Sequence, residues 1–343
     1  MRMTQRRLLV TVTGLSLALA VWSRVDAADP AVLDAAKKEG KVVWYSSLGL
    51  SVAQKVCDAF NKKALGVTCE LMRDGSQRVF QKVMQEAGAG LTIADVVHTS
   101  DSSHYLDFQQ KGMLMRYLPT GADKFRAEFR DKDGFSTVLR GTPYVIAYNT
   151  LKVSQADAPK RWKDLTDPKW KGKLVHGHPG YSGVVMTGII GLLPALGGWD
   201  YYAALVKNNP LVVQSAEDVP MKVAGGEGWI GVSGEYNFYR PMKKGDPIEM
   251  VFPEEGLPFV TSPNAILAKA PHPNAAKVFT DFLFDKDGQQ VLVDDGLYVP
   301  NEAVAYPKDR RPLKELKLIK VDPEEIQKRD DEVKKKFREL FGV

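Results

Sequence analysis

The stretch that decides the fold is Lys41–Lys63, KVVWYSSLGLSVAQKVCDAFNKK. Its apolar start, Val42–Tyr45, is typical of a buried strand, and a turn of small residues, Ser46–Gly49, follows it. Beyond the turn, apolar residues recur at helical spacing, and we expect Ser51 to cap the helix because its hydroxyl can accept a hydrogen bond from a free backbone N–H. A strand that enters a helix through such a turn presents free N–H groups and the positive end of the helix dipole, which suit a negatively charged ligand.

The first residues have the pattern of an export leader. Three arginines precede an apolar run, Leu8–Val21, and small residues at Val25–Ala27 stand at the usual cleavage spacing. The apolar run is too short to span a membrane. We therefore expect residues 1–27 to be a cleaved signal peptide and the protein to be periplasmic.

Charge and hydropathy exclude two classes of protein. Residues 1–27 hold four arginines and one aspartate, so their removal lowers the formal net charge from +5 to +2. The sequence contains no basic stripe of the kind that binds nucleic acid, and no later segment is long and apolar enough to cross a membrane. The remaining length suits about two domains of ~100–200 residues each.

Strand-like and helix-like patterns alternate along the chain, which predicts an α/β fold. Further strands are expected at residues 67–72, 94–98, 136–139, 144–149, 174–176, 211–214, 229–233 and 258–267. Further helices are expected at residues 77–87, 104–111, 199–208, 216–224 and 274–284 and from residue 184 onward. The highly charged end is expected to form a solvated surface helix at Glu324–Phe341, with Phe337, Leu340 and Phe341 docking one face of it.

The two cysteines are expected to form a disulfide. Cys57 lies in the first helix of the decisive stretch, and Cys69 lies in the strand that should pack beside it. In an exported protein an even pair on neighbouring elements favours a bond. Two buried thiols are the alternative, because free cysteine often behaves as a small hydrophobe.

Five junctions between a strand and a helix share one chemistry. Each places hydroxyls and free N–H groups at the carboxyl end of a strand, where α/β sheets bind ligands. The candidate ligand-binding residues at these junctions are Ser46, Ser47, Leu48, Gly49, Ser76, Ser100, Ser182, Gly183 and Ser215. For each serine, plain capping of a helix is the alternative role.

Charged and aromatic residues beside the junctions extend the candidate site. Arg73 and Arg78 flank the second junction, and a guanidinium there would suit a phosphate or carboxylate; a solvated surface arginine is the alternative. Glu235 and Tyr236 follow a strand that should end at the same edge of the fold, where a tyrosine could stack on, hydrogen-bond or ligate a solute. Aromatic core is the alternative role for Tyr236, and Tyr144 completes the set.

Motifs for catalysis are missing from the sequence. The segment Gly231–Glu235 fails at the last position of a Gly-x-Ser-x-Gly elbow, and neither a phosphate-binding loop nor a dinucleotide fingerprint is present. His176 and His178 could form a weak metal pair, but partly exposed loop histidines are the favoured account because no further His or Cys ligand lies nearby. We expect a binding protein rather than an enzyme, with no cofactor and no metal; an exported hydrolase is the alternative.

Seven segments carry a resemblance to a known family: Glu39–Ser47, Ile93–Val96, Tyr144–Asn149, Trp162–Leu165, Trp170–Lys173, His272–Lys277 and Asp287–Gln290. Together they resemble the extracellular solute-binding proteins of bacterial ABC importers, and among these the ferric-iron-binding-protein-like group. The resemblance implies two α/β lobes of the type II periplasmic binding protein, joined by crossing strands and closing on a ligand like a hinged trap. It also implies a monomer that hands its solute to an inner-membrane permease driven by an ATPase.

The resemblance suggests where the lobes begin and end. The crossing strands would be Tyr144–Asn149 and Pro258–Leu267. The resulting units are an N-terminal lobe of residues 28–143 plus 261–310, a C-terminal lobe of residues 144–260 and a helical tail of residues 311–343.

The chain departs from the iron-binding members of this family. Those members have a histidine in the first turn, an acidic residue after the threonine of the third strand, and two adjacent tyrosines. This chain has Leu48–Gly49 in the first turn, Ser100 after Thr99, and Asn237 after Tyr236. Fe(III) prefers anionic oxygen ligands, and one phenolate is too few to hold it bare. The residues favour a small anion (a phosphonate or a phosphorylated or carboxylated compound), with ferric iron or an Fe(III) chelate as the alternative.

Overall fold

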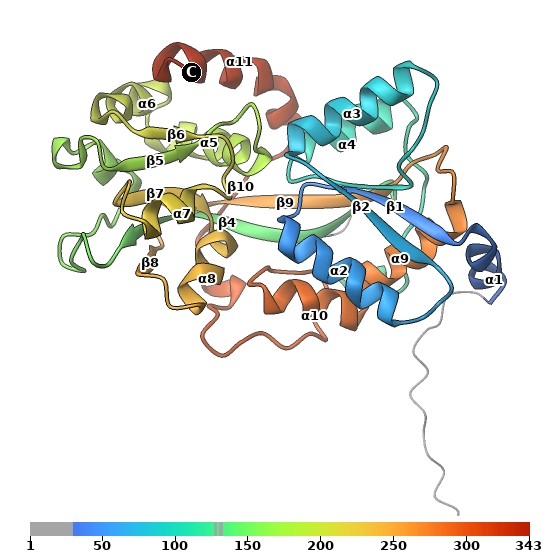
Figure 1. Cartoon of the computed structure of the whole chain (residues 1–343). Helices are drawn as coiled ribbons and strands as arrows, with labels where there is room; N and C mark the ends of the chain where they lie inside the picture. The colour runs from blue at the N-terminus through green and yellow to red at the C-terminus, as the bar shows by residue number, and fades with distance from the viewer. Residues whose placement is uncertain (1–29, 127–128, 130–132) are drawn as a thin grey trace, which may run out of the picture.

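Two α/β lobes lie side by side and are joined by long strands that run from one lobe into the other (Figure 1). This computed structural model describes residues 30–126, 129 and 133–343. The expected signal peptide, residues 1–27, lies outside the described residues. The two-lobe α/β architecture predicted from the sequence is confirmed.

The N-terminal lobe is built on three parallel strands. They are β1 (Lys41–Ser46), β2 (Thr68–Arg73) and β3 (Val96–His98), in the order β2-β1-β3. Its helices are α1 (Pro30–Glu39), α2 (Leu50–Lys62), α3 (Ser76–Gly88), α4 (Ser103–Gln110), α9 (Pro273–Phe284) and α10 (Lys286–Asp294). The strand-turn-helix unit of the decisive stretch is present as predicted, but the helix starts at Leu50.

Gly49, not Ser51, is the N-cap of α2, so the predicted cap is wrong. The backbone N–H groups of Val52 and Ala53 both donate to the Gly49 carbonyl, each at 2.9 Å. No side chain caps this end of the helix. Ser51 instead lies in the first helical turn and is exposed.

The C-terminal lobe has its own strands and helices. Its strands are β5 (Leu174–Gly177), β6 (Leu211–Val213), β7 (Ile230–Gly234) and β8 (Ile248–Val251). Its helices are α5 (Gly183–Leu196), α6 (Trp199–Leu205), α7 (Val219–Ala224) and α8 (Glu235–Lys243).

Short 3-10 turns occur in both lobes and near the C-terminus. They are η1 (Ala122–Lys124), η3 (Trp162–Thr166), η4 (Pro168–Trp170), η5 (Val206–Asn208) and η6 (Leu313–Glu315).

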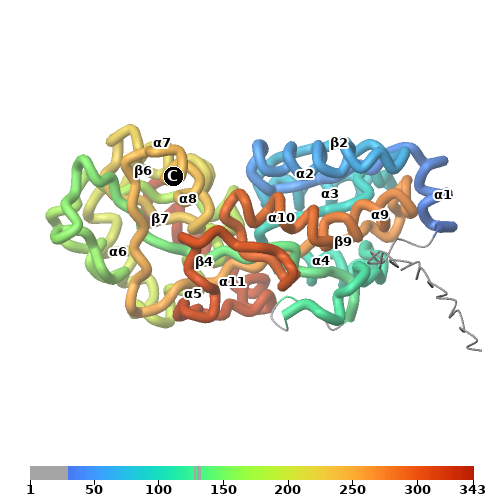
Figure 2. Tube along the Cα trace, turned by 90° about the horizontal axis from the view of Figure 1, so that it is seen from below, coloured from blue at the N-terminus to red at the C-terminus, as the bar shows by residue number. Residues whose placement is uncertain are grey.

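Two antiparallel strands, β4 (Thr137–Asn149) and β9 (Leu257–Ile266), connect the lobes, and both views show them crossing between the lobes (Figures 1 and 2). As far as Pro143, β4 pairs with β9; from Tyr144 onward it pairs with β7 and β8. The separate strands expected at 136–139 and 144–149 are therefore one continuous strand. The short strand β10 (Leu318–Lys320) pairs with the start of β9.

The C-terminal helix α11 (Pro323–Phe341) is more deeply packed than a solvated tail. Phe337 docks as predicted, but Ile326 is also buried in the apolar core of the C-terminal lobe. The Gln327 amide Nε2 donates to Asp107 Oδ1 on α4 at 2.7 Å, so the helix also touches the N-terminal lobe. The expected surface helix with one docked face is therefore confirmed, and the docked face extends from Ile326 through Val333 to Phe337.

The two neighbouring histidines lie beneath α11. His176, on β5, is buried, and its ring centroid lies 5.5 Å from that of Phe337. The His178 ring centroid lies 5.3 Å from that of Phe337. The expectation of a partly exposed loop residue is therefore wrong for His176, which packs as an aromatic core residue.

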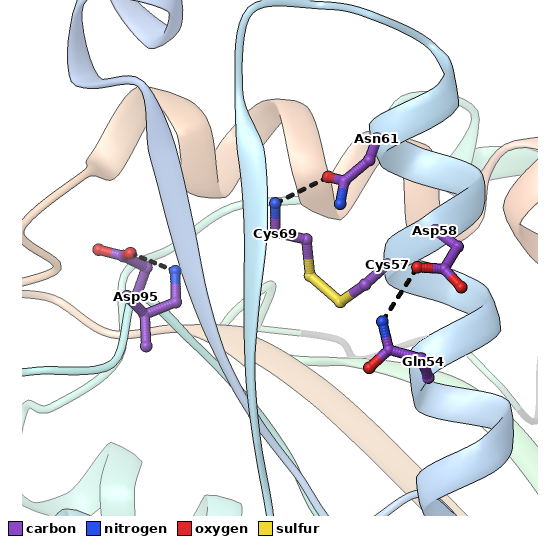
Figure 3. Close-up of a disulfide and its surroundings, with 7 residues drawn as sticks. Gln54, Cys57, Asp58, Asn61, Cys69 and Asp95 are labelled. Atoms are coloured by element: carbon purple, nitrogen blue, oxygen red, sulfur yellow. Dashed lines mark hydrogen bonds between the residues drawn. A yellow bond between two sulfur atoms is a disulfide. The ribbon is translucent and has the colours of Figure 1, made fainter.

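The disulfide between Cys57 and Cys69 is present and ties α2 to β2 (Figure 3). The Cα atoms of the two cysteines are 5.3 Å apart, and both residues belong to the apolar core of the N-terminal lobe. The Asn61 side chain strengthens the same junction, because its Oδ1 accepts from the Cys69 backbone N–H at 2.9 Å. Among the described residues, no single helix is long and apolar enough to cross a membrane.

Candidate functional site

Four buried serines meet where the N-terminal lobe faces its neighbour. They come from the end of β1 and the turn after it, the start of α3 and the loop after β3. The hydroxyl oxygens of Ser76 and Ser100 are 2.6 Å apart, and the Ser100 N–H donates to Ser47 Oγ at 3.0 Å. Ser46 Oγ lies 3.1 Å from His98 Nδ1 at the end of β3. The structure thus brings together the serines predicted at three separate junctions.

A buried arginine without a hydrogen-bond partner lies near this cluster. Arg140, on β4, is 0% exposed, and none of its three side-chain nitrogens is hydrogen-bonded to a described residue. Strand pairing sets Ser262 opposite Arg140 and sets Asn264 opposite both His98 and Thr137. Buried side-chain atoms of these four residues also lack partners within the described chain. Because buried polar groups are normally satisfied, this concentration indicates a binding site for a polar ligand.

Burial and the nearby cation control the charge of His98. Burial lowers the pKa of His98 well below its usual value, and the positive charge of Arg140 lowers this pKa further. The imidazole is therefore neutral at neutral pH. The guanidinium of Arg140 supplies the positive charge beside it.

Tyr236, near the start of α8, brings the C-terminal lobe to Arg140. The guanidinium carbon of Arg140 lies 5.2 Å from the Tyr236 ring centroid, and that of Arg240 lies 5.3 Å from it. These are cation–π distances. Burial raises the pKa of Tyr236, so the phenol is neutral. Within the described chain, neither arginine forms an ion pair with a carboxylate, whereas Arg240 Nη2 reaches Asn237 Oδ1 at 3.5 Å.

An ion pair crosses between the lobes beside Tyr236. Arg73 Nη2, at the end of β2, lies 3.0 Å from Glu217 Oε2 in the loop before α7. Arg73, Arg140, Arg240 and Glu217 all act electrostatically on the Tyr236 phenol. Three of these groups are arginines and one is a glutamate, so their formal net charge is +2. The surroundings of Tyr236 are therefore electropositive.

Close contacts of side chains and backbone join the two lobes. The Tyr181 hydroxyl donates to Asp74 Oδ1 at 3.0 Å. A Cβ atom added to Gly75 would lie 2.5 Å from the Tyr181 ring, and one added to Gly183 would lie 2.6 Å from the Ser100 carbonyl oxygen. The absence of a side chain at both glycines lets the lobes meet in this closed arrangement.

A family model for bacterial extracellular solute-binding proteins matches residues 92–328 of the chain. The chain belongs to this family. The predicted resemblance to solute-binding proteins is therefore confirmed at the level of the family.

Relatives of this solute-binding protein carry different names. An Fe(3+)-binding periplasmic protein of Serratia marcescens is 25% identical over 305 residues, which cover 85% of this chain and 88% of the relative. A probable ABC transporter periplasmic-binding protein of Sinorhizobium fredii is 25% identical over 236 residues, 64% of this chain and 63% of the relative. The periplasmic binding protein AfuA of Actinobacillus pleuropneumoniae, solved with fructose-6-phosphate bound, superposes with a TM-score of 0.80 at 24% identity, covering 89% of this chain and 99% of AfuA. The last comparison establishes the fold.

Several predicted site residues lie at the contact between the lobes of the solute-binding protein. Ser182 is the N-cap of α5, and its side chain makes no capping hydrogen bond. Gly183 follows it and meets the Ser100 carbonyl of the other lobe. The Leu48 side chain is buried in the core, while its carbonyl accepts from Arg73 Nε at 3.1 Å. Gly49 lies beside Glu217.

Other predicted site residues have local structural roles. Tyr144 is stacked on Trp162 with ring centroids 5.8 Å apart, inside the core of the C-terminal lobe. Ser215 Oγ accepts from the Glu217 N–H at 3.2 Å, so it stabilises the turn before α7, whose N-cap is Asp218. Arg78 is largely exposed, and its guanidinium lies over the Tyr181 ring at 5.2 Å.

Glu235 is occupied by another buried arginine. Its Oε2 accepts from Arg310 Nη2 at 3.1 Å, and a second bond joins Oε1 to Nη1. Arg310 Nη2 also donates to the Gly296 carbonyl. Glu235 therefore ties α8 to the segment that follows α10 and does not face the Arg140 cluster.

Sequence reasoning missed Arg140, His98, Ser262, Asn264 and Glu217. Arg140 lies inside a strand, away from the turns between strands and helices where most of the predicted site residues lie. One signal could have found it, namely a single charge within the otherwise uncharged strand Thr137–Asn149. The other residues became visible only through strand pairing or contact between the lobes.

Proposed function

We propose that this chain is the periplasmic solute-binding component of an ABC importer and that it captures a small anionic solute between its two lobes. The family and the relative named as a probable ABC transporter periplasmic-binding protein support the transport role. The solute carries a phosphonate, phosphate or carboxylate group. The protein acts as a monomer, binds without catalysis, and delivers the solute to a permease and ATPase in the inner membrane.

The observation that carries the proposal is the unpaired guanidinium of Arg140. Burying a charge without a counter-ion is costly, by several kcal/mol even after relaxation. Near Arg140 lie four further residues with unsatisfied buried polar atoms. An anion bound here would pair with the guanidinium through charge-assisted hydrogen bonds and would also accept from neighbouring hydroxyl and amide groups. Fructose-6-phosphate, the solute in the AfuA structure, belongs to this chemical class.

The proposed capture is a closure of the lobes about β4 and β9. The lobes comprise residues 28–143 plus 261–310 and residues 144–260, with α11 attached to the second lobe through its buried face. The first lobe contributes the serine cluster and Arg140, and the second contributes Ser182, Gly183 and Tyr236. A solute that touches both sides favours the closed form by its greater affinity for that form. The free N–H groups at the start of α5 add to its hold on an anion.

The electrostatics argue for an anion over bare ferric iron. The Serratia relative is named for Fe(3+) binding. In this chain the net charge of the groups around Tyr236 would repel a bare cation. Asn237, the residue after Tyr236, uses its amide to donate to Ser233 Oγ at 2.9 Å. Iron would therefore enter only together with a chelating anion.

The test is a binding screen on freshly purified protein. Native mass spectrometry first identifies any retained solute, and calorimetry then measures binding of phosphonates, sugar phosphates, carboxylates and ferric citrate. We expect at least one phosphonate, phosphate ester or carboxylate to bind, and we expect Arg140→Gln to weaken this binding at least a hundredfold. Arg116→Gln, at an exposed arginine, serves as the charge-matched control and should leave affinity unchanged.

Three results would contradict the proposal. Tight binding of a neutral sugar or an amine, with no binding of any anion, would show that the site does not bind anions. A coloured phenolate-to-iron band that disappears in Tyr236→Phe would favour the iron alternative. Equal losses in the Arg140 and Arg116 variants would remove the special role of Arg140.

A further inference from the structure

The Arg73–Glu217 ion pair occupies a specific position between the lobes. Both side chains are only partly buried, with exposed fractions of 19% and 22%. The Glu217 backbone N–H is fixed by Ser215 Oγ, and Arg73 Nε is fixed by the Leu48 carbonyl. The carboxylate is thus held against the guanidinium by two anchored segments, one from each lobe.

The Glu217 carboxylate also lies at the uncapped start of α2. A Cβ atom built on Gly49 would lie 3.0 Å from Glu217 Oε1 and 3.2 Å from Arg240 Nη1. No side-chain hydrogen bond caps the thirteen-residue helix that begins after Gly49. The Glu217 carboxylate is thus paired with Arg73 and lies near Arg240 and the uncapped start of α2, a set of groups that would also suit a ligand phosphate or carboxylate.

Glu217 also borders a groove between the lobes. A groove with a volume of about 920 Å³ runs between the lobes, and its lining includes Ser51, Glu217 and Arg240. Arg240 lies over the Tyr236 ring, and that ring contacts Arg140. Glu217 and Arg240 therefore both line the groove and both act on Tyr236, whose ring contacts the buried guanidinium of Arg140.

From these contacts we infer that Glu217 is a built-in competitor anion, which a bound solute displaces from Arg73 and which selects for phosphoryl groups over carboxylates. This inference rests on the proposed function. A tethered carboxylate has a high effective concentration at Arg73. A monocarboxylate solute offers the guanidinium nothing that Glu217 does not already supply. A dianionic phosphonate or phosphate brings a larger charge and a third oxygen, so it displaces Glu217 more readily.

The test compares methylphosphonate with acetate, which share a methyl group and differ in the anionic head. Calorimetry at pH 8 is run on the wild type, on Glu217→Gln and on the control Glu227→Gln. Glu227 is a matched control because its carboxylate pairs with Lys222 in the same lobe and does not line the groove. We expect Glu217→Gln to bind acetate about tenfold more tightly and methylphosphonate about threefold more tightly, so that the preference for the phosphonate shrinks. The control should match the wild type.

A second variant separates competition from misfolding. Glu217→Asp keeps the charge but withdraws it from Arg73 by one methylene group, and it should give affinities between those of the wild type and Glu217→Gln. Weaker or unchanged acetate and methylphosphonate binding in Glu217→Gln would overturn the inference, since Glu217 would then hold the solute or the closed lobes. If Arg140→Gln abolishes binding while Glu217→Gln changes nothing, only this inference fails. If neither probe binds any of the proteins but another anion of the screen binds the wild type, only this inference fails; if no anion of the screen binds, both proposals fail.

Discussion

The guanidinium of Arg140 faces the ring of Tyr236 across the boundary between the lobes, 5.2 Å from the ring centroid. Arg140 lies on the part of β4 that pairs with β9, whereas Tyr236 lies at the start of α8 in the other lobe. Each residue is almost completely buried. This contact forms only when the lobes are together. The guanidinium of Arg140 on β4 therefore has a different environment in the closed form of the protein.

The unpaired charge of Arg140 gives a prediction about stability. Two arginines are deeply buried among the described residues. Arg310 is paired with Glu235, whereas Arg140 has no acidic partner there. Arg140→Met should therefore stabilise the solute-free protein by about 1–4 kcal/mol, because it removes an uncompensated charge. Arg310→Met should lower the free energy of unfolding by about 3–5 kcal/mol, because it leaves the buried carboxylate of Glu235 without its partner. Urea denaturation of the two variants measures both effects, and a loss of stability in Arg140→Met would contradict the unpaired state.

Closure of the lobes should depend on Gly183. A Cβ at this position would lie 2.6 Å from the Ser100 carbonyl oxygen, and a backbone atom cannot rotate away as a side chain can. Gly183→Ala should weaken solute binding at least tenfold and should leave the solute-free protein close to its normal stability. Gly88→Ala is the control, since a Cβ there meets no atom within 4 Å. Calorimetry gives the affinity, and small-angle scattering shows whether solute still compacts the variant; normal compaction would refute the steric argument.

The sequence predicted the architecture because its signals are local. The strand, turn and helix of Lys41–Lys63 depend on spacing within one segment, and the Cys57–Cys69 bond depends on two neighbouring elements. The serines at the ends of β1 and β3 could be grouped because parallel strands end at one edge of a sheet. For such features, chain order and spatial order agree.

The charged part of the site could not be predicted in the same way. Glu235 and Arg310 are 75 residues apart, and no local pattern shows that they pair. Glu217 meets Arg73 only because the lobes close. Arg140 lies in a strand whose register with β9 decides which polar groups surround it. These relationships are properties of tertiary packing, so the sequence assigned Glu235 to the site and overlooked Arg140.

The disulfide should contribute to the stability of the N-terminal lobe. The Cys57–Cys69 bond closes a short loop between α2 and β2, with a sequence separation of 12 residues. Restricting the unfolded chain by a loop of this size is worth about 3 kcal/mol. Replacing both cysteines by alanine should lower the free energy of unfolding by about this amount, measured in urea without reductant. A matching loss in wild-type protein treated with dithiothreitol would assign the effect to the bond, whereas an unchanged reduced protein would assign it to packing of the side chains.

Buried histidines should make stability depend on pH. Burial lowers the pKa of His176 to about 4, whereas an unfolded histidine has a pKa of about 6.5. Between these two pKa values the unfolded state binds a proton that the folded state does not bind. The stability that the neutral His176 provides is therefore complete above pH 6.5 and is lost as the pH falls toward 4. One such group changes the free energy of unfolding by about 1.4 kcal/mol per pH unit between these limits. His176→Phe, which keeps an aromatic ring against Phe337, should reduce the pH slope by this amount between pH 6 and pH 5. Tyr202→Phe is the control, because burial raises the pKa of Tyr202 far above this pH range. Equal pH slopes in the wild type and His176→Phe would contradict the prediction, since the histidine would then take up its proton in the folded protein as well.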